Sequence, residues 1–440
     1  MKRYVRFLSC IVILCLVSGC SVGNTGTGEY FSETATDCPA IQEISSAPDI
    51  SGKKPDFLKK PERDPVPPEK PRTGDAPAVI SGVAPDTAAL LDETAEKYGC
   101  AGVQLAVIKD GAVRYHYEYG FADKGRNSVL KQETKYRCAS LSKPVVAMVA
   151  AAAADATDFD IDTDISSFMG YPVRNPRYPD VPITPRMLMT HTSSVIDSAS
   201  FLESRNSFSS VPLKQLLENG SSYSYSAPGE AYVYSNFGMA VLAAALELFT
   251  GEHFETLAQK YLFGKLDLEC GYLAKDIGDP ALIGTLYYPD GSVGYSVSRQ
   301  LDERHSEAIG QTHHLYQGNL TISAADYAKF ICVLLNDGKA GGRTIISGAG
   351  VKEMLKPQKV SAGHDCALCF DMLETVIPGK TLYCHTGSNF GMFCAFAFDK
   401  DTRNGAVVFT SGADAATDGS GLYNVCADMI KTCFDRILYN

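Results

Sequence analysis

The chain has 440 residues, 45% of them hydrophobic, which is enough to build a large buried core without a disulfide framework. Its formal net charge at pH 7 is −11. We therefore expect no nucleic-acid partner, because affinity for a phosphate backbone comes from clustered basic side chains.

Residues 1–19 predict a lipoprotein signal peptide rather than part of the fold. A basic start, residues 2–6, precedes an apolar stretch at 7–17 that is too short to span a membrane comfortably. The small residues before Cys20 resemble a bacterial lipobox, in which the cysteine becomes lipid-modified. We therefore expect Cys20 to anchor the chain at the extracytoplasmic face of a bacterial cell membrane. Simple secretion after cleavage near Gly19 is the alternative.

Residues 20–80 predict a disordered tether. The first part, to about residue 47, is polar and rich in Gly, Ser and Thr, and residues 48–77 are rich in Pro, Lys and Asp. Neither part buries enough apolar surface to fold alone. The folded domain is expected over residues 81–440.

Strand patterns at both ends of this domain indicate one sheet built from distant segments. A helix is expected at 86–98, before two strands that turn at Asp110-Gly111. The expected strands are 103–108, 113–119, 372–376, 382–384, 392–398 and 406–410. A helix at 422–437 closes the chain. The fold class is therefore α/β (α+β), with an antiparallel sheet flanked by helices.

The pattern Ser-x-x-Lys starts at Ser51, Ser128 and Ser140, and only the last opens a long apolar run, 144–154, that predicts a buried helix. Residues three apart share a helix face, so the Lys143 amine can reach the Ser140 hydroxyl. An amine in an apolar pocket has a lowered pKa and can accept the serine proton. The alternative is a helix-capping serine with a solvent-facing lysine.

A second motif, Tyr234-Ser235-Asn236, precedes an apolar helix expected at 237–249 and ended by Gly251. A tyrosine and an asparagine two residues apart on a tight loop can point into one cavity. Tyr234 can then shuttle a proton, and Asn236 can hold a substrate amide. The alternative is a loop tyrosine followed by an asparagine that caps the helix.

A third motif, His385-Thr386-Gly387-Ser388, lies between strand-like runs. A glycine on an edge strand would let a substrate backbone approach closely. The alternative is an ordinary turn between two strands.

In this order, the three motifs resemble the serine β-lactamase and penicillin-binding superfamily, in its class C-like branch, which also holds DD-peptidases and esterases. The resemblance covers roughly residues 85–437. Four further segments carry it: 136–139, 183–193, 228–230, and 318–323 with Asp326. It implies a β-lactamase/transpeptidase-like fold, in which an all-helical subdomain is inserted into the sheet subdomain and the active site lies between them.

The resemblance also implies roles for the first two motifs. Ser140 would be acylated, and Lys143 would be the base for acylation. Tyr234 would share proton transfer and help in deacylation. Asn236 would bind the substrate amide.

For the third motif, the resemblance implies substrate binding along the strand 385–388. His385 and Thr386 would contact the substrate, and its carboxylate if it has one, while Gly387 lets it approach. Backbone N–H groups of Ser140 and Ser388 would form the oxyanion hole.

The expected activity is that of a serine hydrolase, acting through an acyl-enzyme on D-amino-acid peptides or a related amide or ester. Its expected partners are a small peptide, ester or β-lactam substrate and, through the lipid, the membrane; the chain is expected to be monomeric. His385 and Ser235 look more like DD-peptidase and esterase members than typical β-lactamases, which carry Lys and Ala there. A β-lactamase is the first alternative, and a non-catalytic binding protein for cell-wall fragments or β-lactams is the second.

Five positions depart from the family pattern without removing a catalytic group. Ser194, Cys384 and Asn319 stand where glycine is common, and Ser388-Asn389 replaces a glycine-rich continuation. Each is expected to reshape the pocket, so these departures bear first on the identity of the substrate.

The remaining cysteine and histidine motifs predict no metal site and no cofactor. Cys366 and Cys369, with His364, have no second cysteine pair at zinc spacing. His191 is interpreted as structural. His313-His314 is interpreted either as active-site rim or, more commonly, as solvated loop. Four further cysteines in apolar runs are interpreted as small core residues: Cys138, Cys332, Cys394 and Cys426.

Overall fold

The computed structural model describes residues 81–440 apart from 207–210, 312–313, 359, 361–363, 415, 418 and 440. The predicted signal peptide, Cys20 and the tether lie outside the described residues, so the membrane anchor stays a prediction.

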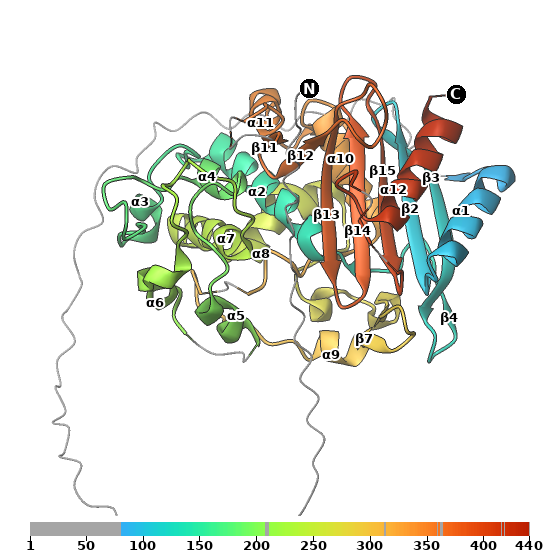
Figure 1. The fold of residues 1–440 in the computed structure, drawn as a ribbon, viewed down its shortest axis with the longest axis horizontal. Coiled ribbons are helices and arrows are strands. Elements are labelled where there is room, and N and C mark those ends of the chain that lie inside the picture. The colour runs from blue at the N-terminus through green and yellow to red at the C-terminus, as the bar shows by residue number, and fades with distance from the viewer. Residues whose placement is uncertain are drawn as a thin grey trace, which may run out of the picture. The chain divides into compact units, whose positions relative to one another are not determined.

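A nine-stranded sheet organises the described part of the chain, in the order β1-β3-β2-β15-β14-β13-β12-β11, with β4 beside β3 (Figure 1). Its strands are β1 (Ser81–Gly82), β2 (Gly102–Lys109), β3 (Ala112–Asp123), β4 (Ser128–Val129), β11 (Cys366–Ala367), β12 (Phe370–Leu373), β13 (Leu382–Asn389), β14 (Met392–Asp399) and β15 (Asn404–Ser411). The predicted sheet from distant segments is confirmed, because β2 pairs antiparallel with β15. The pairing is antiparallel throughout except for β1, which runs parallel to β3.

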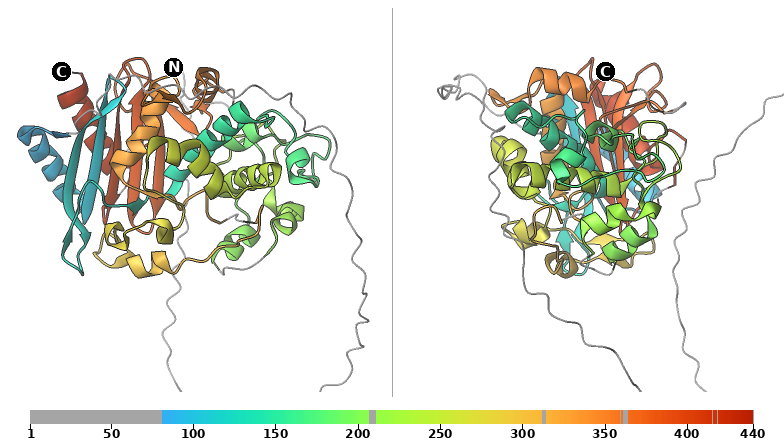
Figure 2. Two further views of the ribbon diagram at one scale, coloured as in Figure 1. Left: turned by 180° about the vertical axis from the view of Figure 1, so that it is seen from behind. Right: turned by 90° about the vertical axis from the view of Figure 1, so that its left-hand side faces the viewer.

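The helices lie on both faces of the sheet and in a separate layer beside it (Figures 1 and 2). They are α1 (Pro85–Lys97), α2 (Ser142–Ala156), α3 (Ser166–Met169), α4 (Pro185–Met189), α5 (Ala199–Asn206), α6 (Leu213–Glu218), α7 (Asn236–Thr250), α8 (Phe254–Ala258), α9 (Val297–Leu301), α10 (Ala324–Leu335), α11 (Gly348–Met354) and α12 (Asn424–Cys433). The sheet carries α1 and α12 on one face and α10 on the other.

The alternation of side chains along β2 supplies two separate cores, because successive residues of a strand point to opposite faces. Val103, Leu105 and Val107 join the core beneath α1 and α12. Ala106 and Ile108 join the larger core that continues into the helical layer. This strand is buried on both faces, which accounts for its continuous apolar sequence.

One expectation needs correction, and one alternative is wrong. The inserted part is not all helical, because three two-stranded pairs lie within it: β5 (Tyr136–Arg137) with β8 (Thr321–Ile322), β6 (Leu286–Tyr287) with β7 (Val293–Tyr295), and β9 (Lys339–Ala340) with β10 (Arg343–Thr344). The third motif lies on a strand as expected, and the alternative of a turn is wrong. It continues β13 as far as Asn389, because every residue from Tyr383 onwards pairs with β14.

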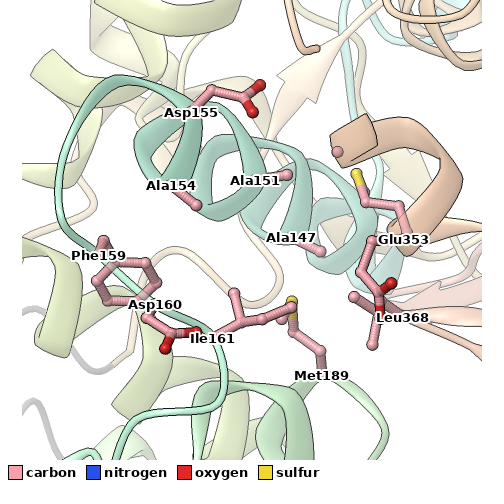
Figure 3. A pocket seen from close by; sticks show the side chains of 12 residues that line it. Ala147, Ala151, Ala154, Asp155, Phe159, Asp160, Ile161, Met189, Glu353 and Leu368 are labelled. Carbon is pink, nitrogen blue, oxygen red and sulfur yellow. The ribbon is translucent and has the colours of Figure 1, made fainter. Parts of the chain in front are cut away.

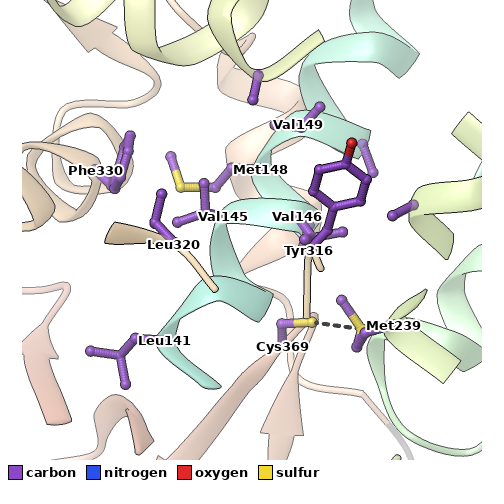
Figure 4. Packing of buried hydrophobic residues seen from close by; sticks show 14 of the residues in the cluster. Leu141, Val145, Val146, Met148, Val149, Met239, Tyr316, Leu320, Phe330 and Cys369 are labelled. Atoms are coloured by element: carbon purple, nitrogen blue, oxygen red, sulfur yellow. Dashed lines mark hydrogen bonds between the residues drawn. The ribbon is translucent and has the colours of Figure 1, made fainter. Parts of the chain in front are cut away.

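Helix α2 is the central helix of the larger core (Figure 4). It extends the predicted run of 144–154 at both ends, and Pro144 falls in its first turn, where a missing N–H is harmless. The stretch Ala139–Ala156 is long and apolar enough to cross a membrane by composition, but 72% of it is buried inside the protein. Its apolar character therefore serves the core.

A cavity of about 270 Å³ lies beside α2, against α4, α11 and the loop at 159–161 (Figure 3). Alanines 147, 151 and 154 of α2 form one wall, and Phe159, Ile161, Met189, Met354 and Leu368 supply most of the rest. Small side chains on this side of α2 leave apolar surface without close packing partners, which costs stability.

We expect Ala151→Leu to stabilise the protein by about 1 kcal/mol, because a larger side chain fills this cavity and buries apolar surface. The melting temperature should rise by about 2 °C for a domain of this size. Ala152→Leu is the matched control. Ala152 is 97% buried and does not line the cavity, so overpacking should lower the melting temperature. Equal effects of the two variants in thermal unfolding would contradict the prediction.

Candidate active site

The segment 138–141, which we call the nucleophile loop, carries Ser140 from β5 into α2. Leu320 holds this loop at both ends. The Cys138 N–H donates to the Leu320 carbonyl oxygen at 2.8 Å, and the Leu320 N–H donates to the hydroxyl of Ser142, the residue after the loop, at 3.0 Å. Ala139 has φ +48°, a left-handed backbone that costs a non-glycine residue about 1 kcal/mol. Local backbone strain is therefore found immediately before Ser140.

Lys143 lies one helical turn from Ser140 and is fully buried. Its Nζ is 2.9 Å from the Ser140 Oγ and 2.8 Å from the carbonyl oxygen of Gln317. The i, i+3 spacing thus brings amine and hydroxyl together as expected, and the alternative of a solvent-facing lysine is wrong. The Gln317 carbonyl was not foreseen, because any residue can supply a backbone oxygen.

Tyr234 lies beside Lys143. Lys143 Nζ is 5.0 Å from the centre of its ring. Loss of solvent around the hydroxyl raises the pKa of Tyr234 well above its usual value, while a hydrogen bond with Ser140 acts in the opposite direction. The residue is 39% exposed, so one part of the ring faces solvent while the hydroxyl is turned towards Ser140. Tyr234 is therefore a protonated phenol at neutral pH.

Asn236 is the first residue of α7, and the cap of that helix is Ser235, whose hydroxyl accepts from the Gly238 N–H at 2.8 Å. The alternative of an asparagine cap is therefore wrong. The Asn236 amide donates to Asp197 at 2.6 Å, and the same carboxylate accepts from the Phe237 N–H at 2.8 Å. Asp197 was missed by sequence reasoning, although a carboxylate at a helix N-terminus is favourable.

His191 contacts the loop that carries Tyr234 and Ser235. The Ser235 N–H donates to its Nδ1 at 3.2 Å, and its ring lies 4.5 Å from that of Tyr234. Burial, and then Lys143, hold the pKa of His191 well below its usual value. His191 is therefore neutral, with its proton on Nε2.

The third motif forms an open edge of the sheet. β12 pairs only with Leu382–Cys384 of β13, and no other described strand pairs with that side of residues 385–389. His385 is 6% exposed, and its Nδ1 lies 2.8 Å from the Thr386 carbonyl oxygen. Burial lowers the pKa of His385 to about 4, Lys143 acts in the same direction, and Asp371 opposes the shift.

Gly387 is where β13 meets the nucleophile loop. A Cβ at this position would lie 2.7 Å from the Cys394 Sγ, 2.8 Å from the Cys138 carbonyl oxygen and 3.1 Å from the Ser140 nitrogen. Only glycine allows so close an approach. The motif thus brings the Ser140 N–H beside the open edge of β13. The oxyanion hole that includes Ser388 stays a prediction.

The arrangement matches a known family model. The beta-lactamase family model covers residues 87–424, which is more than half of the chain. The chain belongs to the beta-lactamase family. It is a family of serine hydrolases, and its resemblance to this chain, predicted from three motifs, is confirmed.

Individual relatives match over shorter lengths. The chain is 25% identical over 178 residues to Penicillin-binding protein 4* of Bacillus subtilis (strain 168), which is 40% of this chain and 38% of that one. It is 24% identical over 203 residues to Esterase EstB of Burkholderia gladioli, which is 43% of this chain and 51% of that one. The chain thus matches less than two thirds of the length of either relative.

Solved structures extend the similarity of fold. The octameric penicillin-binding protein homologue from Pyrococcus abyssi superimposes with a TM-score of 0.64 at 17% identity, over 79% of this chain and 76% of that one. At this identity, the match supports the predicted β-lactamase/transpeptidase-like fold alone.

The departures from the beta-lactamase family pattern fall at positions with distinct structural roles. Ser194 has φ +66°, which explains why glycine is common there. Cys384 is fully buried beneath α1 and α12. Asn319 donates to Glu303 at 2.7 Å and accepts from Arg137. The expectation that Cys384 reshapes the pocket is therefore wrong, because its neighbour His385 points to the opposite face.

Thr386 and Ser388 alternate with His385 and Gly387 along β13. Ser388 and Thr386 both act to lower the pKa of Tyr423, against the larger effect of burial; Tyr423 precedes α12 and was missed by sequence reasoning. Their roles in substrate binding stay predictions.

Cys369 lies close enough to the site for Lys143 to lower its pKa, against the larger effect of burial. Cys366 and Cys369 are free thiols, and the Cys369 Sγ lies 3.6 Å from the Met239 sulfur. His364 stacks on Tyr232, with ring centres 3.6 Å apart. Among the described residues, no group of three or more His, Cys, Asp or Glu side chains is placed to hold a metal. His313 lies outside the described residues, and His314 stacks on Phe201.

Proposed function

We propose that the protein is a serine hydrolase that forms an acyl-enzyme on Ser140 and acts on D-amino-acid peptides or a related amide or ester. The observation that carries the proposal is the 2.9 Å contact between the Lys143 amine and the Ser140 hydroxyl, beside Tyr234, whose pKa Ser140 acts to lower. A nucleophile needs a base within such a distance to attack at neutral pH. A penicillin-binding protein and an esterase among the relatives support both substrate classes.

In the proposed reaction, the Ser140 Oγ attacks the carbonyl carbon of the substrate and its proton passes to the Lys143 amine. The Tyr234 hydroxyl gives its proton to the leaving nitrogen or oxygen and regains one from Lys143. The Ser140 N–H, which lies beside β13, stabilises the oxyanion. Water then attacks the acyl-enzyme, and its proton passes through the same groups to the Ser140 Oγ as the bond between Oγ and the acyl carbon breaks and the acid is released.

The test is covalent labelling of the full-length protein with a fluorescent fluorophosphonate and a fluorescent penicillin. We expect the wild type to be labelled and Ser140→Ala to remain unlabelled, because no other group would attack the probe. Equal labelling of the two proteins would contradict this expectation. A lack of labelling of the wild type by both probes would also contradict the proposal.

Steady-state turnover then separates the alternatives. Cleavage of a D-alanyl peptide or a p-nitrophenyl ester supports the proposed substrate class. Fast hydrolysis of nitrocefin, without peptide or ester cleavage, would show a β-lactamase instead. Thermal stabilisation by these ligands without any product would show a binding protein.

A further inference from the structure

The carbonyl oxygen of Gln317 is a direct partner of the proposed base, because it accepts from Lys143 Nζ at 2.8 Å. The same Nζ lies 2.9 Å from the Ser140 Oγ. An amine that takes a proton must present its lone pair to that proton. An N–H engaged with another acceptor limits how the amine turns about its last bond. The position of the Gln317 carbonyl therefore bears on how well Lys143 accepts the Ser140 proton.

The peptide that carries this carbonyl is followed by Gly318, whose backbone has little to restrict it. A Cβ at Gly318 would meet nothing within 4 Å, so no residue beyond its chain neighbours limits it sterically. Glycine is also the residue with the widest range of backbone angles. The Gly318 N–H donates to the Leu315 carbonyl at 3.3 Å, which is a long hydrogen bond. Further contacts are needed to keep the peptide between Gln317 and Gly318 in one orientation.

Arg137, the residue before the nucleophile loop, supplies these contacts. Its Nε donates to the Gly318 carbonyl oxygen at 3.0 Å, and its Nη2 donates to the side-chain oxygen of Asn319. A guanidinium is a rigid planar fork, so two contacts from one fork restrict both acceptors together. The backbone of Arg137 is itself placed by the pairing of β5 with β8, where it lies opposite Thr321.

The guanidinium is held on its other sides as well. The Arg137 Cζ lies 5.3 Å from the centres of both the Tyr295 and the Phe390 rings, and these two rings stack with centres 4.5 Å apart. A cation is attracted to the face of an aromatic ring. Glu303 joins the same cluster, because it accepts from the Tyr295 hydroxyl at 3.0 Å and from the Asn319 amide at 2.7 Å. These contacts restrict the orientation of the fork that Arg137 presents to the turn.

We propose that Arg137 is a positioning residue that acts on the reaction through the Gln317 carbonyl and Lys143. The guanidinium fixes the backbone at 318–319, this backbone fixes the carbonyl, and the carbonyl orients the amine. The inference rests on the proposed function and adds to it a residue that acts through other residues. It also gives a role to Asn319, which stands where glycine is common in the family, as the second partner of the guanidinium.

The test measures single-turnover acylation by a chromogenic ester in the full-length protein. Arg137→Met removes the fork, and we expect the acylation rate constant to fall at least about tenfold, as small misplacements of a reacting group do. Arg137→Lys keeps the charge and one donor, so its rate constant should lie between those of Arg137→Met and the wild type. Arg299→Met is the matched control. It removes a second guanidinium, 5.1 Å from the centre of the same Tyr295 ring, and should stay within about twofold of the wild type.

A second background decides whether Arg137 acts through Lys143. In Lys143→Met, the amine that the Gln317 carbonyl orients is gone. Adding Arg137→Met to this variant should therefore slow the residual acylation by less than about twofold. A residue that only supports the fold would slow both backgrounds by the same factor.

Thermal unfolding checks that each variant is folded. Asn319→Gly takes the place of Arg137→Met in both comparisons if that variant is unfolded, because it removes one partner of the fork without changing the charge. Acylation should be slower in Asn319→Gly than in the wild type.

Two results would overturn the inference and leave the proposed function standing. One is Ser140-dependent acylation that is as fast in the folded fork variant as in Arg299→Met. The other is an equal loss of rate in the Lys143→Met background. Failure of the proposed function would look different, as ester cleavage that Ser140→Ala does not abolish or as no acylation of the wild type, and it would remove this inference as well.

Discussion

Replacing Lys143 with methionine is expected to lower kcat by about 10²- to 10⁴-fold, the usual contribution of a positioned general base. The side chain is fully buried, and methionine fills a similar volume without a charge. The variant should therefore fold, although the Gln317 carbonyl loses its donor at 2.8 Å, which costs about 1 kcal/mol. Single-turnover acylation by a chromogenic ester measures the effect directly.

Lys143→Arg separates the role of the base from that of the charge. Arginine keeps a positive charge near Ser140 but cannot give up its proton at any ordinary pH. We expect this variant to be as slow in acylation as Lys143→Met. Retention of more than a tenth of wild-type kcat in either variant would show that another group takes the Ser140 proton.

The second large effect is expected for Gly387→Ala. The added Cβ would lie within 3.0 Å of the Cys394 Sγ and the Cys138 carbonyl oxygen, so either β13 or the nucleophile loop must move. Overpacking of this kind costs about 1–3 kcal/mol. Because the displaced atoms include the backbone of Ser140, kcat should fall at least about tenfold, as small misplacements of a reacting group do.

Gly82→Ala is the matched control, since a Cβ at Gly82 of β1 meets nothing within 4 Å. Thermal unfolding and ester hydrolysis should leave this control close to the wild type. If Gly387→Ala behaves in the same way as Gly82→Ala, the strand and the loop are not held together as closely as the structure shows.

The sequence predicted the part of the site that depends on local spacing. Ser140 and Lys143 are three residues apart on one helical turn, so their contact follows from helix geometry alone. The partners that fix them could not be predicted in this way. The Gln317 carbonyl is 174 residues from Lys143, and Asp197 is 39 residues from Asn236. Such contacts depend on tertiary packing. Every residue has a backbone carbonyl oxygen, so the residue type at a position does not show whether that oxygen accepts a hydrogen bond.

The fold, too, was predicted best where the local sequence pattern is strong. Strands with strict apolar runs, such as β14 and β15, were placed within one or two residues. The third motif was expected to follow a strand of only three residues, because His, Thr, Gly and Ser lack the β-branched or aromatic pattern of a buried strand. Pairing with β14 overrides that local preference. The helical subdomain was predicted from the resemblance, and its three small strand pairs were not predicted.

The order of the strands has a consequence for how activity arises during synthesis. β2, β3 and α2 leave the ribosome early, whereas β15, the neighbour of β2, and β13, which borders Ser140, come from the last part of the chain. Pairing between segments so far apart must wait until β15 has been synthesised, and it costs a large loop-closure entropy. An incomplete chain therefore carries a serine without its binding edge. On the proposed function, acyl transfer requires β13 and β15 to dock, so chains that lack these strands should be inactive.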